Sequence, residues 1–212
     1  MIKVITLERE YGSGGGSIAR KLAERLGWKL WDKDLTDELA RSMNCDLAEV
    51  QCREERRDPL HYRFLKSLMR GSFAGNPNAP AMRLLDADRI VAATCRLVKE
   101  AAEAGNGVIV GRGGACCLQE RDDAYHVFVY APVEDKIRRL RESGKSEAEA
   151  KDLVDSVDKE RAAAIKKHFD LEWPGRHRYH LMINTSIGEE AVVRTILKGI
   201  AVLERRYSVR RH

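Results

Sequence analysis

A glycine-rich loop near the N-terminus constrains the fold of this chain more than any other feature. The loop joins an apolar, strand-like run at 2–7 to a helix-like run at 18–26. Glycine has no Cβ, so the main chain can bend tightly and direct several N–H groups inward, and the start of a helix adds partial positive charge. We therefore expect a phosphate-binding loop made of Gly12, Ser13, Gly14, Gly15, Gly16 and Ser17.

The loop fits the phosphate-loop pattern of many nucleoside monophosphate kinases, G-x-x-G-x-G-K-G-[ST], with two departures. When Ser17 takes the final hydroxyl position, Gly15 falls where the lysine belongs and Arg9 replaces the first glycine. The lysine of such loops reaches the phosphates that are being transferred. The sequence therefore predicts a phosphate loop whose missing positive charge must come from another residue.

Two other interpretations of the loop remain open at this point. Gly12, Gly14 and Ser17 nearly satisfy the dinucleotide fingerprint G-x-G-x-x-G, and Asp32 stands about 20 residues further on as a ribose ligand. A flexible glycine turn without a ligand is the third interpretation. The residues 8–11, which separate the strand from Gly12, favour the longer loop that wraps a phosphate.

Length and composition favour one domain, 1–212, with 43% hydrophobic residues. The 38 Lys and Arg residues exceed the 33 Asp and Glu residues and give a net charge of +5, which suits small anions. Basic residues alternate with acidic ones outside the tail 205–211, so we do not expect a nucleic-acid partner. The run 1–7 is too short for a signal peptide, and no apolar run approaches a membrane span of about 20 residues. We expect a cytoplasmic protein that does not associate with membranes.

The cysteine pattern favours reduced, mostly buried thiols. The chain has 5 cysteines, an odd number, and none of them are in C-x-x-C spacing. A disulfide framework or a structural zinc site is therefore not expected.

Strand-like and helix-like runs alternate along the chain, which predicts an α/β fold with a parallel sheet covered by helices. The expected strands are 2–7, 28–31, 107–110, 125–130 and 180–184. Apolar residues every three or four positions after Gly188 predict a final helix on one face of the sheet. Two regions interrupt this alternation, a polar helical one at 33–81 and a highly charged one at 144–178.

Four segments together resemble the cytidylate kinase-like family of P-loop proteins over nearly the whole chain: 12–17, 22–28, Trp31-Asp32 and 110–113. The resemblance implies a P-loop NTPase-type three-layer fold with a five-stranded parallel sheet, an acceptor-binding helical region at 33–81 and a lid at 144–178. It also implies an ATP-dependent phosphotransferase that uses Mg²⁺ and moves the γ-phosphoryl group to a nucleoside monophosphate or a similar small acceptor.

The resemblance also assigns residues. It implies that Ser17 meets magnesium and that Arg112 holds the acceptor phosphate, although Gly113 replaces the aspartate that follows this arginine in the family. In the lid, Asp158 and Arg161 match the D-x-x-R element, in which the aspartate binds the acceptor nucleoside and the arginine closes onto phosphate.

Simpler roles remain open for three of the residues. Arg112 also suits an ion pair near the sheet edge, and Arg161 suits a solvated helix face. Asp32 suits an N-cap, although its place after the second strand also suits an acceptor ligand that polarises a hydroxyl or holds a metal-bound water.

Arg9 and Lys145 are the candidates for the missing positive charge, and we favour Arg9 because it belongs to the same loop and its planar fork binds phosphate in a bidentate way. Arg9, Arg112 and Arg161 are thus the expected catalytic cations. The departures at Gly15 and Gly113 leave an alternative, a non-catalytic nucleotide sensor or interaction module. The sequence makes no prediction about oligomeric state.

Overall fold

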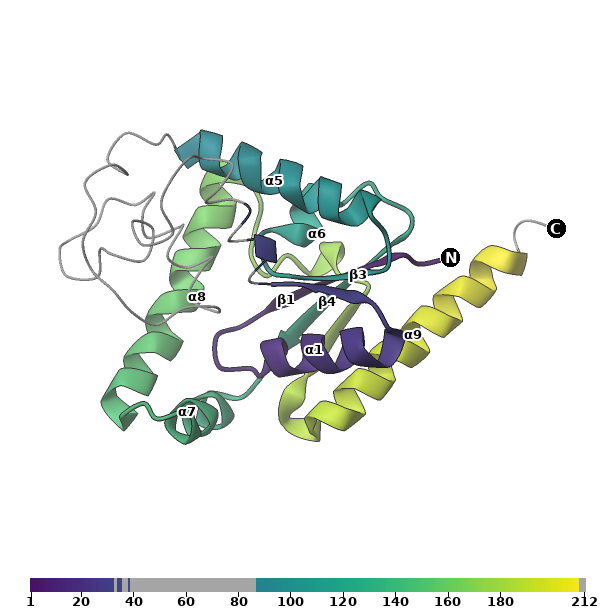
Figure 1. Ribbon diagram of the computed structural model, residues 1–212. Helices are drawn as coiled ribbons and strands as arrows, with labels where there is room; N and C mark the ends of the chain where they lie inside the picture. Colours follow the sequence, from purple (N-terminus) through teal and green to yellow (C-terminus); the bar gives the residue numbers. More distant parts are fainter. Residues whose placement is uncertain (33, 36–37, 39–86, 210–212) are drawn as a thin grey trace.

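Five parallel strands cross the centre of the protein in the order β2-β3-β1-β4-β5 (Figure 1). The computed structural model describes residues 1–32, 34–35, 38 and 87–209. The strands are β1 Val4–Arg9, β2 Lys29–Trp31, β3 Gly107–Val110, β4 Ala124–Tyr130 and β5 Leu181–Asn184. Each overlaps a run that the sequence predicts, so the parallel α/β sheet is confirmed. The order differs from the 3-2-1-4-5-6 order of dinucleotide-binding folds, which argues against that interpretation of the loop.

Helices cover both faces of the sheet. Helices α1 (Gly15–Leu26) and α9 (Glu189–Val209) lie on one face, and α5 (Ala87–Glu103) and α6 (Gly114–Cys117) lie on the other (Figure 1). Successive residues of a strand point to opposite faces. Accordingly, Ile5 and Leu7 are buried in the core under α1 and α9, whereas Val4 belongs to the core under α5. The predicted three-layer fold is thereby confirmed.

The last helix follows the predicted pattern. Val192, Ile196 and Ile200 of α9 are buried against the sheet and α1. Beyond the sheet α9 continues outward toward the C-terminus (Figure 1), and Glu204 accepts a hydrogen bond from the main-chain N–H of Ile2 at 2.8 Å. The helix therefore covers one face of the sheet and also binds the segment just before β1.

Helices α7 (Val133–Glu142) and α8 (Glu147–Phe169) pack against each other at one end of the molecule (Figure 1). The side chain of Ser146 caps α8 by accepting a hydrogen bond from the main-chain N–H of Glu149. The short helices η2 (Arg176–Arg178) and η3 (Thr185–Ile187) flank β5. Helix α8 thus lies within the range 144–178 that was assigned to a lid. The range 33–81 lies outside the described residues apart from 34–35 and 38.

The prediction of reduced thiols is wrong for two cysteines. Cys95 of α5 and Cys117 of α6 form a disulfide, with Cα atoms 5.3 Å apart, and Cys116 is free. The two helices cover the same face of the sheet, so packing brings together residues that are 22 positions apart. Spacing along the chain gave no sign of this contact.

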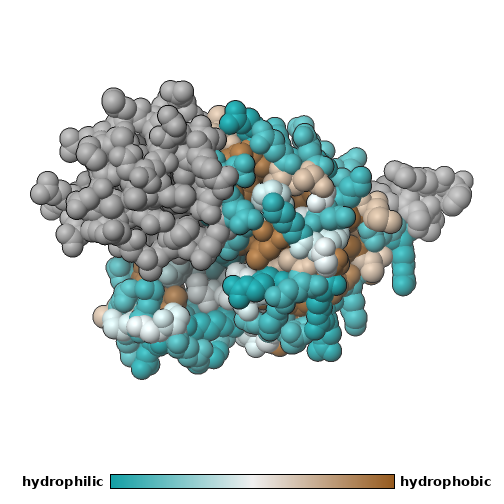
Figure 2. All heavy atoms as spheres, in the orientation of Figure 1, coloured by the Kyte–Doolittle hydropathy of each residue, from teal (hydrophilic) through white to brown (hydrophobic). Residues whose placement is uncertain are grey.

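Among the described residues on the face drawn in Figure 2, most of the surface is hydrophilic, and apolar atoms show in smaller patches. In the part of the chain that the structure describes, no helix combines the length and the apolar character that a membrane span needs.

Gly199 of α9 provides a test of how closely this helix packs on the sheet. A methyl group at residue 199 would collide with the Oη atom of Tyr125, whose side chain is buried and stacked on His180. Overpacking costs about 1–3 kcal/mol, and a direct collision with a buried side chain places this variant at about 2–3 kcal/mol. The gain in helix propensity offsets about 1 kcal/mol, so Gly199→Ala should lower the free energy of unfolding by about 1–2 kcal/mol. Urea denaturation measures the change. The double variant Tyr125→Phe/Gly199→Ala should recover part of the loss, whereas a single variant as stable as the wild type would contradict the packing.

Candidate active site

The glycine loop leaves β1 at Arg9 and enters α1 at Gly15. Gly12 and Gly14 have φ angles of 77° and 81°, in the left-handed region that favours glycine, and Gly14 caps α1 without a side-chain hydrogen bond. Within the described residues no group accepts a hydrogen bond from the main-chain N–H of Gly14, Gly15 or Gly16. These donors at the positive end of a helix are suited to bind an anion.

The side chain of Arg9 fills the space beside Gly15. A Cβ atom at residue 15 would lie 2.7 Å from Cδ and 2.8 Å from Cβ of Arg9, and 3.1 Å from Cγ2 of Val129. Carbon atoms do not approach this closely without displacing one another. The loop therefore accommodates either the arginine at position 9 or a lysine at position 15, which explains why the lysine of ordinary phosphate loops is missing.

The guanidinium group of Arg9 reaches across the ends of the neighbouring strands. Its Nη1 atom lies 3.0 Å from the position of a Cβ atom on Gly111, and its Nη2 atom lies 4.0 Å from Oδ1 of Asp32. Arg112 is buried beside it, and its Nη2 atom donates a hydrogen bond to the main-chain oxygen of Asp32 at 3.3 Å. The structure thus brings Arg9, Asp32 and Arg112 together at the carboxyl ends of β1, β2 and β3.

Helix α8 contributes Arg161 and Asp158 to the same place. The Nη1 atom of Arg161 donates to the main-chain oxygen of Arg9 at 2.9 Å and to Oδ1 of Asp158 at 3.0 Å. The main-chain N–H of Tyr11 donates to both oxygens of Asp158, at 2.9 and 3.1 Å. The side chain of Arg161 is only 13% exposed, so the solvated-face interpretation does not hold. Helix α8 therefore lies against the start of the phosphate loop.

Burial and mutual repulsion both act on the arginines. Burial, followed by repulsion from Arg9, lowers the pKa of Arg112 to about 10. Burial and repulsion from Arg161 likewise lower the pKa of Arg9. These groups remain charged at neutral pH, and a bound anion would relieve their repulsion. Three largely buried guanidinium groups arranged in this way are suited to bind an anion.

Glu8 is a buried carboxylate beneath this cluster that the sequence analysis did not single out. The Glu8 carboxylate accepts a hydrogen bond from the main chain of Gly114. Its Oε1 atom is buried and has no hydrogen-bond partner among the described residues. Burial raises the pKa of Glu8, although Arg9, Arg161 and Arg112 oppose the shift. The fold therefore places a carboxylate where its charge is poorly solvated and close to three arginines.

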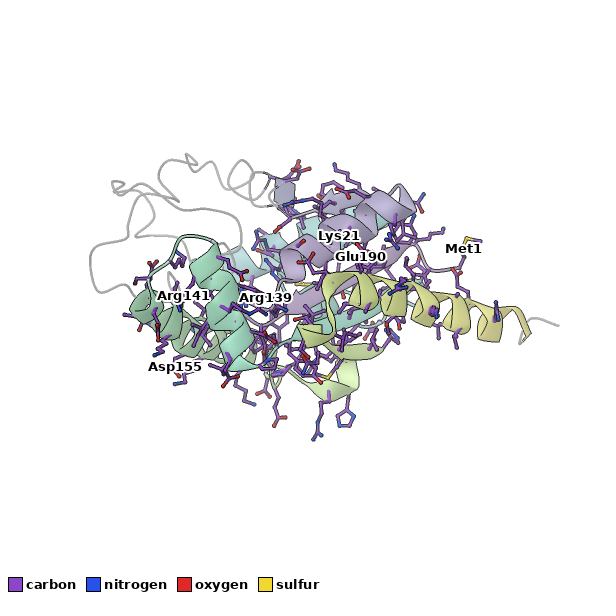
Figure 3. The ribbon with its side chains drawn as sticks, turned by 90° about the horizontal axis from the view of Figure 1, so that it is seen from below. Met1, Lys21, Arg139, Arg141, Asp155 and Glu190 are labelled. Atoms are coloured by element: carbon purple, nitrogen blue, oxygen red, sulfur yellow. A yellow bond between two sulfur atoms is a disulfide. The ribbon has the colours of Figure 1, made fainter. Side chains whose placement is uncertain are left out.

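Ser17 faces a different element from the arginines. Its Oγ atom donates a hydrogen bond of 2.8 Å to Oε2 of Glu189, at the start of α9. Lys21 forms ion pairs with Glu189 at 2.8 Å and with Glu190 at 3.4 Å, where α1 and α9 meet (Figure 3). Because the Ser17 hydroxyl donates its proton to a carboxylate, its lone pairs remain oriented away from Glu189 and suited to a hard cation such as Mg²⁺.

Ser13 has a structural place in the loop. Its hydroxyl donates to the main-chain oxygen of Glu10 at 2.8 Å, and its own main-chain oxygen accepts a hydrogen bond of 2.8 Å from Oγ1 of Thr185. Arg139 of α7, labelled in Figure 3, in turn donates to Thr185 at 3.0 and 3.1 Å. Residues of η3 and α7 therefore hold the loop in shape.

The predicted residues thus fall into two groups. The cluster formed by Arg9, Asp32, Arg112, Asp158 and Arg161 lies at the strand ends, and Ser17 lies on the α9 side of the loop. Sequence reasoning missed three neighbours of the loop, which are Glu8, Lys136 and Glu189. A charged residue directly after the apolar run 2–7 was the signal for Glu8, whereas the charged helices around Lys136 and Glu189 gave none.

Known proteins share this architecture. The model of the cytidylate kinase-like family matches residues 4–187. No protein in a curated set matches the sequence. An uncharacterized protein from Eubacterium ventriosum ATCC 27560 is similar in structure, with a TM-score of 0.66, 23% identity, and 95% of this chain and 99% of that chain covered.

Two solved kinases are also similar in fold. Shikimate kinase from Bacteroides thetaiotaomicron has a TM-score of 0.53 and 16% identity, with 95% of this chain and 99% of that chain covered. A gluconokinase from Sinorhizobium meliloti 1021 has a TM-score of 0.54 and 16% identity, with 99% and 98% covered. At these identities the likeness establishes the kinase-type P-loop fold.

Adjacent glycines provide a matched test of the contact between Arg9 and the loop. Gly15→Ala should lower the free energy of unfolding by about 1–3 kcal/mol, because its methyl group meets the stem of Arg9. Gly16→Ala should be neutral or slightly stabilising, because no atom lies within 4 Å of the added carbon and alanine favours a helix. Urea denaturation of the two variants measures this difference. Equal effects would refute the steric account.

Glu8→Gln should increase the stability of the protein at neutral pH. The pKa of Glu8 is raised in the folded protein above its ordinary value of 4.5. The folded state therefore binds this proton more tightly than the unfolded state, and the charged carboxylate costs stability once the pH rises above about 4.5. The variant should unfold at higher urea than the wild type at pH 7, and the difference should shrink toward pH 4. A variant that is less stable than the wild type at pH 7 would show that the arginines outweigh burial.

Proposed function

The chain belongs to the cytidylate kinase-like family, and from that premise we propose that it is an ATP-dependent phosphotransferase. In this proposal the protein moves the γ-phosphoryl group of ATP to a nucleoside monophosphate or a similar small acceptor. The observation that carries the proposal is the convergence of Arg9, Arg112 and Arg161, from three separate elements, beside a loop of open main-chain N–H groups.

The loop suits the donor side of the reaction. In-line phosphoryl transfer needs positioning and charge neutralisation more than covalent help from the protein. The N–H groups of Gly14, Gly15 and Gly16, from which no described residue accepts a hydrogen bond, are suited to hold donor phosphate oxygens. Ser17 would contribute a ligand to Mg²⁺, which neutralises phosphate charge when it is bound.

The arginine cluster suits the phosphoryl group in transit and the acceptor. Guanidinium groups bind phosphate oxygens in pairs, and Arg9, Arg112 and Arg161 surround the position between the loop and Asp32. We assign Arg112 to the acceptor phosphate and Asp32 to an acceptor hydroxyl. Asp158 would bind the acceptor only after releasing the N–H of Tyr11, to which it is now hydrogen bonded.

Gly113 supports an acceptor that differs from the family's usual one. Its φ angle of 64° lies in the left-handed region, which glycine adopts without strain and which few other residues adopt. A side chain there would also approach Phe169 and Ile165 of α8, at 3.5 and 3.8 Å from the added carbon. The chain next to Arg112 therefore combines a left-handed glycine with close packing against α8, and it has no carboxylate at position 113. For this reason the acceptor should be sought among several chemical classes.

The test is to incubate the pure protein with Mg·ATP and a panel of nucleoside monophosphates, nucleosides, sugars and small hydroxy acids, and to follow ADP. ADP that appears only with one acceptor class supports the proposal and identifies the substrate. Thermal stabilisation by ATP without turnover on any acceptor would instead support the nucleotide sensor. Absence of ATP binding would overturn both.

Arginine replacements test the roles within the cluster. Arg9→Lys and Arg112→Lys keep the positive charge but lose the planar fork, so kcat should fall about 10²-fold or more, as when one transition-state donor is removed. Arg96→Lys is the matched control, since Arg96 lies on α5, 63% exposed, in an ion pair of 3.7 Å with Glu100. Turnover of the Arg9 or Arg112 variant close to that of the control would remove that residue from the mechanism.

A further inference from the structure

Residue 15 supplies no cation to the donor phosphates, and the guanidinium group of Arg9 lies at the strand ends, where the proposed function assigns it to the phosphoryl group in transit. Residue 15 has no side chain, and the stem of Arg9 prevents one. The guanidinium of Arg9 extends to Gly111 and Asp32, at the ends of β3 and β2. The start of the loop, from Glu10 to Gly12, would then face donor phosphates without a positive side chain from the loop itself.

Helix α7 places Lys136 directly on this part of the loop. A Cβ atom on Gly12 would lie 3.0 Å from Cβ, 3.2 Å from Cα and 3.2 Å from the main-chain oxygen of Lys136. The first turn of α7 therefore rests on the loop at a residue that must be glycine. The side chain of Lys136 is only 7% exposed, which is rare for lysine.

The ammonium group of Lys136 forms ion pairs with two carboxylates beside the first residues of the loop. Its Nζ atom lies 2.6 Å from Oε2 of Glu10 and 3.6 Å from Oδ2 of Asp158. Asp158 also accepts the N–H of Tyr11, so one carboxylate occupies a loop N–H and a lysine at the same time. A carboxylate that receives both a loop amide and a cation stands where a phosphate oxygen would receive them.

We propose that Lys136 supplies the ammonium group that binds the donor phosphates, in place of the lysine absent from the loop. The inference rests on the proposed function, because it assigns a residue to the donor side of the same site. When the triphosphate enters the loop, its oxygens replace Asp158 at both the Tyr11 N–H and the Lys136 Nζ. Glu10 remains beside the ammonium as an anion that competes with the phosphates for it.

The charges around Asp158 favour this exchange. Burial raises the pKa of Asp158, so its charge is not fully compensated there even though Arg161, Tyr11 and Lys136 oppose the shift. A triphosphate brings more negative charge to the same donors, and each charge-assisted hydrogen bond is stronger than a neutral one. Release of Asp158 would also free α8 to place this aspartate toward an acceptor.

A purely structural ion pair predicts a different pattern of variants. If Lys136 only tied α7 and α8 to the loop, removing Lys136 or Glu10 would have the same consequence for nucleotide binding. If Lys136 binds phosphate, its removal weakens binding, whereas removal of Glu10 frees the ammonium from a competing anion. The two accounts therefore predict opposite changes in ATP affinity when Glu10 is removed: a loss if Lys136 is structural, and no loss or a gain if Lys136 binds phosphate.

The experiment measures equilibrium binding of ATP, ADP and AMP, with Mg²⁺, by calorimetry for the wild type and four variants, and the melting temperature of each. Lys136→Met should weaken ATP about 10- to 100-fold, the loss expected for one charge-assisted hydrogen bond, and AMP by much less. Lys136→Arg should retain most of the ATP affinity. Glu10→Gln should bind ATP as tightly as the wild type or more tightly. Lys159→Met, in α8 beside Asp158 but 73% exposed, is the matched control and should bind like the wild type.

Equal losses for ATP and AMP in Lys136→Met, no loss at all, or parallel losses in Lys136→Met and Glu10→Gln would each overturn the inference. If Lys136→Met does not fold, the result for Lys136→Arg and Glu10→Gln decides, because the ATP affinity of Glu10→Gln must not fall. A wild-type protein that binds no ATP would refute the proposed function, whereas tight ATP binding that is insensitive to residue 136 would refute only this inference.

Discussion

Repulsion among buried guanidinium groups is the constraint on which the rest of the site depends. Arg9, Arg112 and Arg161 come from different elements and are held together by contacts with Asp32, Asp158 and main-chain oxygens. Taking several cations out of water is costly unless each finds a partner. The fold supplies carboxylates of its own as partners, and an additional anion would relieve the repulsion that remains. The carboxylates that stabilise the folded protein thus compete with a bound anion for the same arginines.

Much of this arrangement follows from the sequence, because parallel strands end at the same edge of a sheet. Arg9, Asp32 and Arg112 each stand at or just after a predicted strand, so their meeting at the strand ends could be anticipated. The strands, the final helix and the phosphate loop were equally accessible through apolar periodicity and glycine spacing. The family resemblance added the contribution of α8, which periodicity alone would have left as a solvated helix.

The remaining features depend on contacts that no local pattern encodes. Lys136 is one of several charged residues in a short amphipathic helix, and only its packing on Gly12 distinguishes it from its solvated neighbours. The disulfide between Cys95 and Cys117 likewise requires knowing that α5 and α6 cover the same face of the sheet. Tertiary proximity decides both, and one sequence carries no direct record of it.

The contact between the Arg9 stem and Gly15 limits which sequence changes a loop of this kind can accept. The two positions share one volume, so a long side chain at position 15 requires a smaller residue at position 9. Conversion from an ordinary phosphate loop, one substitution at a time, therefore passes through a small residue at both positions. Intermediate sequences would have lacked both cations. A basic residue already present on the neighbouring helix α7 would have preserved nucleotide binding in such intermediates.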